Sequence, residues 1–343
     1  MAIERDSNPP KLKSVSKKPK TKTSSFGVSK RESHNSADFY SRFKTPVLST
    51  DETVNRPKTV NQIFCQNSKK MNQIADNSVG LVITSPPYFA GKEYEELNGN
   101  SKSPATYKAY LKMLGQVFAE CYRVLEPGGR IAVNVANLGR KPYRSLSADV
   151  IKILEEQLRF LLRGEVIWQK AVGASGNCAW GSFALATNPV LRDITERIII
   201  ASKGRFERAI PTKKRESLDL PYKSTIDKQD FMDWTLDLWN VAPESAKRVG
   251  HPAPFPVEIP RRLIELYSFE NDLIVDPFVG SGSTAIAAIR STRNYIGYDL
   301  DESYCQLAED RIAKEKLVLE SLTKEKPKTT KQKSHPTKKL SKF

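Results

Sequence analysis

The stretch Val79-Gly80-Leu81-Val82-Ile83-Thr84-Ser85-Pro86-Pro87-Tyr88 places a polar, proline-containing turn directly after an apolar run. Residues 79–83 have the length and composition of a buried strand. Each proline fixes φ and removes an N–H donor, and the residue before a proline is held in an extended conformation. Ligands of open α/β sheets bind at the carboxyl ends of the strands, so this stiff turn is a candidate ligand-binding segment.

A second strand-to-turn stretch lies far downstream. Residues 271–275 read as another buried strand, followed by Asp276-Pro277-Phe278-Val279-Gly280-Ser281-Gly282-Ser283-Thr284 and a helical pattern over residues 285–289. A glycine-rich turn of this kind lets the backbone approach a ligand and directs helix N–H groups at an anion. A short strand over residues 294–299 then ends in Asp299, 17 residues after Gly282. Nucleotide-binding βαβ units carry their ribose-binding carboxylate at about this spacing.

These motifs resemble those of the amino-group DNA methyltransferases that use S-adenosyl-L-methionine. The run ending in Tyr88 is similar to their catalytic motif, residues 276–284 to their cofactor motif, and residues 251–264 to the segment that completes the cofactor pocket. The catalytic motif precedes the cofactor motif, as in the circularly permuted beta group of that family. The resemblance covers roughly residues 59–312. It implies an α/β fold, a doubly wound, mostly parallel, seven-stranded Rossmann-like methyltransferase sheet with a target-recognition insertion.

The resemblance also implies roles for individual residues. In the catalytic motif, the Ser85 hydroxyl and the Pro86 carbonyl would accept hydrogen bonds from the amino group, and Tyr88 would stack on a base extruded from duplex DNA. In the cofactor site, Phe278 would pack on the adenine and Asp299 would accept from the ribose hydroxyls. The implied catalytic residues are Ser85, Pro86, Pro87 and Tyr88, and the implied cofactor-binding residues are Asp276, Phe278, Gly280, Gly282, Thr284, Asp299 and Phe255.

Thr284 and the glycine pattern have alternative interpretations, and His251 is not assigned a catalytic role. Thr284 would bind the cofactor carboxylate, but a helix N-cap is an alternative role for it. His251 has prolines around it and no acid partner at motif spacing, and it reads as structural. The Gly280-x-Gly282-x-x-Ala285 pattern also fits a dinucleotide site, although a nicotinamide enzyme would leave the Ser-Pro-Pro-Tyr run without a role.

The first motif position bears on the substrate. Within the resembling family, serine there usually goes with the N4 of cytosine, and Asp or Asn with the N6 of adenine. Ser85 therefore favours an N4-cytosine enzyme, while an N6-adenine enzyme and an inactive DNA-binding relative stay open. Methylation of cytosine carbon-5 needs a Pro-Cys nucleophile, and none of the four cysteines follows a proline: Cys65, Cys121, Cys178 and Cys305.

Two positions depart from the family's pattern. The acid that usually precedes the catalytic strand is replaced by Gln66, which puts a carboxylate contact to the cofactor's adenine in doubt. Gly80 stands where the family commonly has Asp.

Composition bounds the organisation of the chain. The 343 residues, 39% of them hydrophobic, suit one large domain with an insertion. No run approaches the roughly 20 apolar residues of a membrane span, and no secretory signal is evident. The cysteines are scattered without a C-x-x-C pair, so we expect no metal site and a reducing, cytoplasmic setting in a prokaryote.

Charge is concentrated at the ends. The net charge is +16, of which residues 1–57 contribute +6 and residues 323–343 contribute +7. We therefore expect a disordered basic N-terminal arm (1–57), a methyltransferase domain (58–322) and a disordered lysine-rich tail (323–343). Basic and aromatic residues in 203–246 make this segment the candidate target-recognition insertion. The expected partners are double-stranded DNA, a cognate restriction endonuclease and a second copy of the chain, with no membrane.

Hydrophobic periodicity predicts the remaining elements. Strands are expected over residues 61–66, 130–135, 165–169 and 196–201, the last two antiparallel. Helices are expected over residues 107–125 and 147–162, a turn or short helix over 69–74, and a loop over 89–105.

Overall fold

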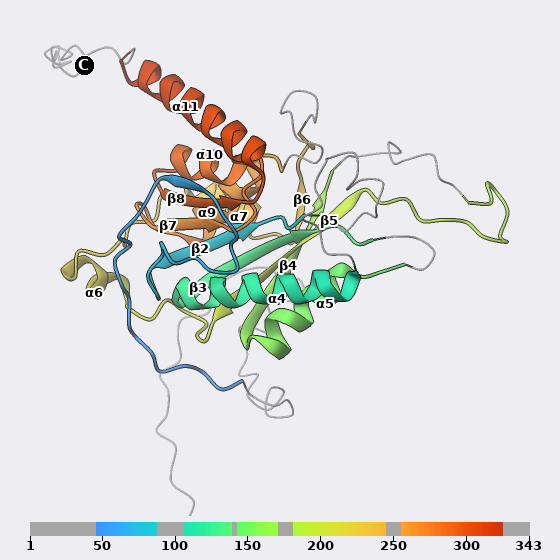
Figure 1. The fold of residues 1–343 in the computed structure, drawn as a ribbon, viewed down its shortest axis with the longest axis horizontal. Helices are drawn as coiled ribbons and strands as arrows, with labels where there is room; N and C mark the ends of the chain where they lie inside the picture. Colours follow the sequence, from blue (N-terminus) through green and yellow to red (C-terminus); the bar gives the residue numbers. More distant parts are fainter. Residues whose placement is uncertain (1–45, 88–105, 139–142, 171–180, 245–254, 325–343) are drawn as a thin grey trace, which may run out of the picture. The chain divides into compact units, whose positions relative to one another are not determined.

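The computed structural model of the chain describes residues 46–87, 106–138, 143–170, 181–244 and 255–324. Contacts divide the chain into Met1–Val47 and Leu48–Phe343, and the fold below is that of the second unit. Its centre is an eight-stranded sheet in the order β1-β8-β7-β2-β3-β5-β4-β6. Figure 1 shows this sheet between the helices. The strands are β1 (Gln62–Cys65), β2 (Val79–Thr84), β3 (Leu125–Val135), β4 (Phe160–Gln169), β5 (Thr195–Lys203), β6 (Leu238–Asn240), β7 (Leu273–Asp276) and β8 (Asn294–Asp299).

The directions of the strands determine where functional residues gather. β5 is antiparallel to both of its neighbours, and the other strand pairs are parallel. The carboxyl ends of the parallel strands and the amino end of β5 therefore meet at one edge of the sheet. In open α/β sheets this edge binds the ligand.

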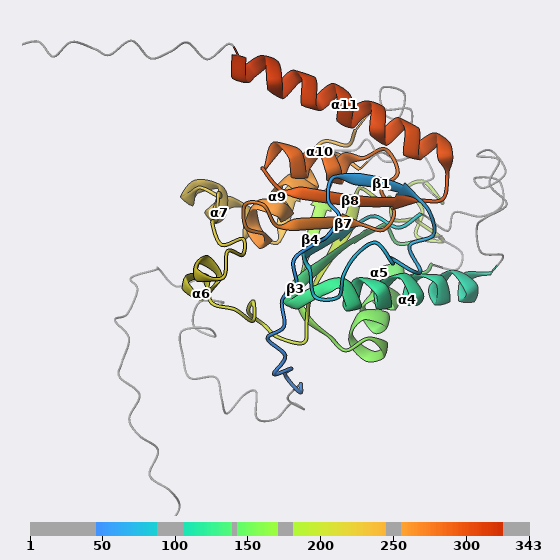
Figure 2. The same cartoon turned by 60° about the vertical axis from the view of Figure 1, so that its left-hand side comes forward.

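Helices cover both faces of the sheet, as Figures 1 and 2 show. On one face, α4 (Tyr107–Val124), α5 (Leu146–Lys152) and the π-helical turn η1 (Ile153–Gln157) bury their apolar side chains in one core. On the other face, α9 (Glu258–Tyr267), α10 (Ser283–Arg290) and α11 (Glu302–Lys324) contribute to a second core. The short helices α6 (Thr212–Ser217) and α7 (Lys228–Trp234) lie between β5 and β6 in the chain. This arrangement confirms the predicted doubly wound, mostly parallel α/β fold.

The central strands show why the sequence adopts this fold. All six residues of β2 are buried, as expected for a parallel strand with helices on both faces. α4 presents Tyr110, Leu114, Val117 and Cys121 to the core at helical spacing, and the Thr106 hydroxyl accepts the Ala109 N–H at its N-terminus.

Two predictions about the elements were wrong. The sheet has eight strands rather than seven, because β6, from within residues 203–246, pairs with the edge of β4. The helix predicted over residues 147–162 ends at Gln157, and β4 begins at Phe160. Arg159 adopts a φ of 61°, which breaks the helix, and apolar residues 160–162 continue into a strand.

A buried ion network joins the segment after β5 to the sheet. The Arg208 guanidinium donates to Glu126 and, at 3.1 Å, to Asp272, while Arg215 donates to Glu126 at 2.8 Å. All four side chains are at most 10% exposed. Burial opposes ionisation, but the two guanidinium groups hold the pKa of Glu126 below its usual value. The segment is therefore fixed to the start of β3 and of β7 by a charge-balanced cluster.

The same network explains one departure from the family pattern. A Cβ atom on Gly80 would lie 2.7 Å from a carboxylate oxygen of Asp272 and 3.2 Å from the Arg208 guanidinium. A side chain at position 80 would therefore force Asp272 or its arginine partners to move. The carboxylate that Asp272 places beside Gly80 thus favours glycine at this position.

Candidate active site

The two sequence motifs meet at the carboxyl edge of the sheet. β2 and β7 are parallel neighbours, with Val82 opposite Val275. At the strand ends, the Thr84 hydroxyl donates a 2.8 Å hydrogen bond to Asp276, across 192 positions of sequence. The Ser85 turn and the glycine-rich turn therefore start from directly bonded residues.

Asp276 is the polar centre of this junction. Besides Thr84, its carboxylate accepts the Thr284 hydroxyl at 2.6 Å and the Phe278 N–H at 3.0 Å. The residue is 4% exposed, and burial raises the pKa of Asp276 to about 6, although the three hydrogen bonds oppose this shift. The carboxylate ties together the end of β2, the end of β7 and the first turn of α10.

The glycine-rich turn wraps onto the end of β8. The Gly280 N–H donates to Asp299 at 3.0 Å, and the Asp301 N–H donates to the other oxygen of that carboxylate at 3.0 Å. Gly282, with a φ of 81°, is the N-cap of α10, and a Cβ there would lie 3.0 Å from that of Ala308. Burial raises the pKa of Asp299, which is partly exposed.

These features suit a nucleoside-bearing cofactor. Glycine at positions 280 and 282 leaves the turn without side chains, so a ligand can reach its backbone. The Asp299 carboxylate at the end of β8 offers an acceptor for sugar hydroxyls. The half-buried Phe278, packed against the core of the α4 face, is the aromatic residue of the turn 276–284.

The remaining predicted residues have mixed outcomes. Thr284 is not the N-cap, since Gly282 occupies that position without a side-chain cap, and its hydroxyl donates to Asp276 instead. Phe255 is half-buried and its ring meets that of Trp168 edge-on, with centroids 6.3 Å apart. Pro86 is buried and Pro87 exposed. Tyr88 and His251 lie outside the described residues.

Gln66 follows β1 at the same edge. Its side-chain carbonyl accepts the Gln73 amide at 2.6 Å, and Gln73 in turn accepts the Tyr298 hydroxyl at 3.0 Å. Gln66, which replaces the usual acid, is thus hydrogen-bonded to Gln73, and Gln73 is bonded in turn to Tyr298.

Ser85 is contacted by a polar group from the next strand. Because Thr84 lies opposite Val133 in the β2–β3 pair, Ser85 and Asn134 lie side by side just beyond it. The Asn134 amide donates to the Ser85 hydroxyl at 3.4 Å and also to the Glu196 carboxylate, at the start of β5. Lys170, just after β4, forms an ion pair with the other oxygen of Glu196.

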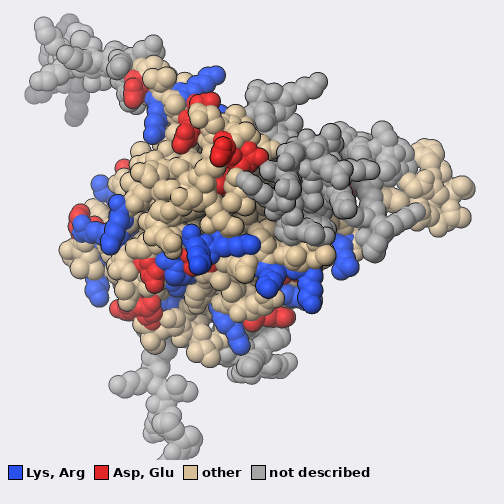
Figure 3. All heavy atoms as spheres, in the orientation of Figure 1, with Lys and Arg blue, Asp and Glu red and all other residues tan. Residues whose placement is uncertain are grey.

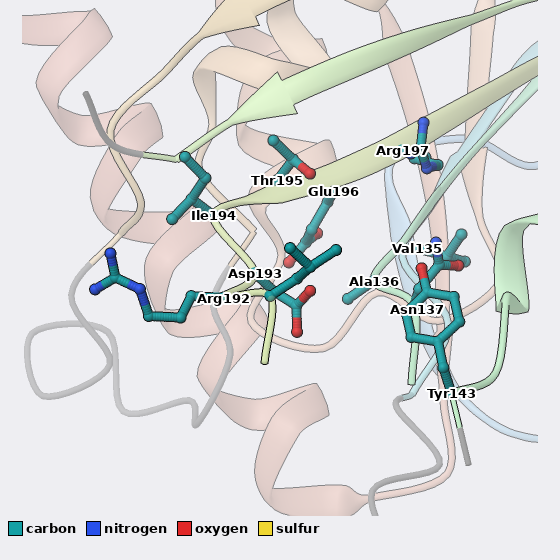
Figure 4. A pocket seen from close by; sticks show the side chains of 11 residues that line it. Val135, Ala136, Asn137, Tyr143, Arg192, Asp193, Ile194, Thr195, Glu196 and Arg197 are labelled. Carbon is teal, nitrogen blue, oxygen red and sulfur yellow. The ribbon is translucent and has the colours of Figure 1, made fainter. Parts of the chain in front are cut away.

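A cavity of about 310 Å³ opens next to this polar group. Figure 4 shows Tyr143 and Asn137 on one side of it, and Arg192 and Ile194 on the other. Glu196 lines the cavity and also accepts from Asn134, so the cavity adjoins the Ser85 turn. Its volume is of the order of a small-molecule or single-base pocket.

Asn134, Glu196 and Lys170 were not predicted from the sequence. Asn134 is the one polar residue in the run Ile131–Val135, and Glu196 lies two residues before the apolar run Ile198–Ala201. A polar side chain near the end of a buried strand is the signal that could have found them. Their mutual contact depends on strand order, which the sequence does not display.

Most residues of this site lie within the range that matches a known protein family. A family model for N6/N4 enzymes, described as DNA methylase, matches residues 79–310. The chain belongs to the N6/N4 DNA methylase family. The Type II methyltransferase M.MjaI of Methanocaldococcus jannaschii is 32% identical over 299 residues, which cover 78% of this chain and 94% of that protein.

Solved structures agree with the fold. A Thermus thermophilus protein assigned as a DNA modification methylase, in complex with S-adenosyl-L-methionine, matches with a TM-score of 0.59 and 28% identity, covering 75% of this chain and 96% of that one. The cytosine-N4-specific PvuII DNA methyltransferase matches with a TM-score of 0.55 and 18% identity, covering 77% of this chain and 95% of that one, and supports the fold alone. The chain is thus a DNA methyltransferase, and the predicted cofactor, S-adenosyl-L-methionine, is confirmed.

Three further features of the described residues concern charge on the surface, membrane-spanning helices and clusters of metal ligands. On the face drawn in Figure 3, Lys and Arg side chains of the described residues are interspersed with Asp and Glu and form no field of one sign. In the described ranges, none of the helices is long and apolar enough to span a membrane, and no cluster of three potential metal ligands occurs.

Proposed function

We propose that this methylase is a beta-group, site-specific enzyme that transfers a methyl group from S-adenosyl-L-methionine to the exocyclic N4 of a cytosine flipped out of duplex DNA. The observation that carries the choice of base is Ser85, the first residue after β2 and the neighbour of Asn134. Serine at this motif position favours cytosine in the family that the motifs resemble.

The chemistry requires acceptors around the amino group. Its lone pair is delocalised into the ring, so acceptors that bind the two N–H groups make the nitrogen more nucleophilic. The Pro86 carbonyl and the Ser85 hydroxyl are the proposed acceptors, with Pro87 stiffening the turn and Tyr88 as the stacking surface for the base. The cofactor supplies an electrophilic methyl group, and positioning of the amino nitrogen in line with it is the main contribution of the protein.

The cofactor would be held by the glycine-rich turn and the end of β8. Asp299 accepts from the ribose hydroxyls, Phe278 and Phe255 line the pocket, and Gly280 and Gly282 admit the methionine part. Asp276 orders this turn by its bonds to Thr84, Thr284 and Phe278. The Thr284 hydroxyl donates its proton to Asp276, so it does not donate to the cofactor carboxylate as predicted and can only accept from a donor group of the cofactor.

Recognition of the DNA sequence is assigned to residues 203–246, which contribute β6 and the anchored α6. Asn55 is bonded to Asn77, Arg56 to Leu218 and Asp219, and α11 runs to Lys324, so the predicted bounds of the arm (1–57) and the tail (323–343) were wrong. The basic residues before and after the described chain would bind phosphates without sequence preference and with strong salt dependence. The similarity to M.MjaI, which is named a Type II methyltransferase, supports a role of this enzyme in protecting DNA beside a restriction endonuclease. The enzyme would act alone or as a homodimer.

The test is identification of the methylated nucleoside. DNA from a methylation-free host is incubated with the protein and labelled S-adenosyl-L-methionine, digested to nucleosides and analysed by mass spectrometry. N4-methylcytosine in the wild-type reaction, and its loss in Ser85→Ala at unchanged DNA affinity, are the expected results. N6-methyladenine as the product would overturn the cytosine assignment, and no transfer to any duplex would indicate an inactive DNA-binding relative.

A further inference from the structure

Asn134 is held in one amide orientation by the residues around it. Its Nδ2 donates to Glu196, and an ionised carboxylate can only accept. The other oxygen of Glu196 forms an ion pair with Lys170, whose ammonium is also 5.4 Å from the centre of the Trp168 ring. The Nδ2 and Oδ1 positions of Asn134 are therefore fixed by the network and cannot be exchanged.

The opposite atom of this amide is an acceptor without a donor. Asn134 is 1% exposed, and its Oδ1 has no hydrogen-bond partner within the described part of the chain. An unpaired buried carbonyl destabilises the folded state, so native proteins rarely keep one without a reason. Here it lies at the carboxyl edge of the sheet, in the same side chain that contacts Ser85.

The contact also constrains the Ser85 hydroxyl. Because its oxygen accepts from Asn134 Nδ2, its own proton is directed to a different acceptor. Cytosine presents such an acceptor, the ring N3, directly beside its amino group. In this arrangement Ser85 donates to the ring nitrogen instead of accepting from the amino group, the role that the motif alone gave it. One amino N–H is then left for an acceptor other than Ser85 and the Pro86 carbonyl.

We propose that Asn134 is a further catalytic residue: its Oδ1 accepts a hydrogen bond from the amino group of the target base, and its Nδ2 sets the donor direction of the Ser85 hydroxyl. Glu196 and Lys170 are positioning residues that act through Asn134. The amino group would thus be bound by Asn134 Oδ1 and the Pro86 carbonyl, both held in place before the base arrives. This inference rests on the proposed methyl transfer to an exocyclic amino group.

The decisive experiment is a swap of the amide and the acid. The target sequence is first mapped with the full-length wild-type protein. Methyl transfer to a duplex that carries this sequence is then measured for four variants: Asn134→Ala, Asn134→Asp, Glu196→Gln and the double variant Asn134→Asp/Glu196→Gln. Asn134→Asp places two carboxylates against each other. In the double variant, the glutamine amide at position 196 donates to one carboxylate oxygen of the aspartate at position 134. The second oxygen of that aspartate is then left as a fixed acceptor. Net charge is the same in the double variant as in the wild type. Glu156→Gln, an exposed replacement on η1, is the control.

The expected result is a split between turnover and binding. Asn134→Ala and Asn134→Asp should lose about 100-fold in kcat, the magnitude typical of one preorganised hydrogen-bond partner, while Kd for DNA and for cofactor change less than about threefold. The double variant should recover at least about tenfold of the loss in Asn134→Asp. If Asn134→Ala does not fold, the double variant alone decides.

Two outcomes would overturn the inference. One is an Asn134→Ala enzyme that folds and keeps kcat within about threefold of the wild type. The other is a folded double variant no faster than Asn134→Asp. A product that is N6-methyladenine would refute the cytosine assignment but not this inference, since adenine also presents an amino group beside a ring nitrogen acceptor.

Discussion

Replacing Asp276 by asparagine isolates the effect of one buried charge on stability. The side chain is 4% exposed and accepts from the hydroxyls of Thr84 and Thr284 and from one backbone N–H. Asparagine has the same shape and carries no charge. Its Oδ1 can keep the bonds to Thr84 and the backbone, and the Thr284 hydroxyl can turn to accept from Nδ2.

The magnitude follows from the two titrations. Burial raises the pKa of Asp276 from 3.8 to about 6. Between these values the folded state keeps a proton that the unfolded state has lost, so stability is highest at low pH and falls as the pH rises through 6. From pH 5 to pH 8 the fall is about 1.4 kcal/mol, roughly tenfold in the unfolding constant. The asparagine variant has no such titration at this position.

Urea unfolding of both proteins at pH 5, 6, 7 and 8, at constant ionic strength, measures this difference. The free energy of unfolding of Asp276→Asn, relative to the wild type, should rise by about 1.4 kcal/mol across the series, most of it between pH 5 and pH 7. Asp310→Asn, an exposed replacement on α11, controls for the removal of one charge. A relative stability that stays constant with pH would refute the burial argument.

Three further changes test the packing of the sheet. Gly80→Ala should lower the urea midpoint by the equivalent of about 1–3 kcal/mol, because the new Cβ would lie 2.7 Å from an Asp272 oxygen. Gly115→Ala, inside α4 with its nearest neighbour atom at 3.6 Å, should instead raise stability by about 0.5–1 kcal/mol in the same assay. Arg215→Met should lose about 3 kcal/mol because Glu126 keeps its buried charge with one guanidinium fewer, and an unchanged midpoint would contradict that account.

Local patterns in the sequence predict much of the sheet. Residues 79–83 and 294–299 form strands as expected. The first is an apolar run that precedes the Pro86-Pro87 turn, and the second is a short run that ends in Asp299. The adjacency of the two motifs follows from a parallel sheet, in which strand ends meet at one edge. The predicted end of the helix over residues 147–162 was wrong, because residues 158–162 are apolar enough for either a helix or a strand. The positive φ of Arg159, which ends the helix, cannot be read from the sequence.

The polar part of the site depends on pairing between distant segments. Asn134 and Glu196 are 62 positions apart and meet only because β5 inserts between β3 and β4. Likewise, Gly80 looks like a loss of the family's acid until Asp272, brought alongside by the β2–β7 pairing, is seen to fill the space. Such compensation is a property of the folded neighbourhood rather than of either residue.

If residues 203–246 recognise the DNA sequence, as proposed, the ion network that anchors α6 limits how this segment can be exchanged to engineer new specificities. A segment taken from a relative and grafted in place of residues 203–246, after β5, would have to include arginines equivalent to Arg208 and Arg215. Without these arginines, Glu126 and Asp272 would be two buried carboxylates without counter-ions, at the start of β3 and just before β7. Interchangeable recognition segments are thus limited to those that carry their own counter-ions for the scaffold.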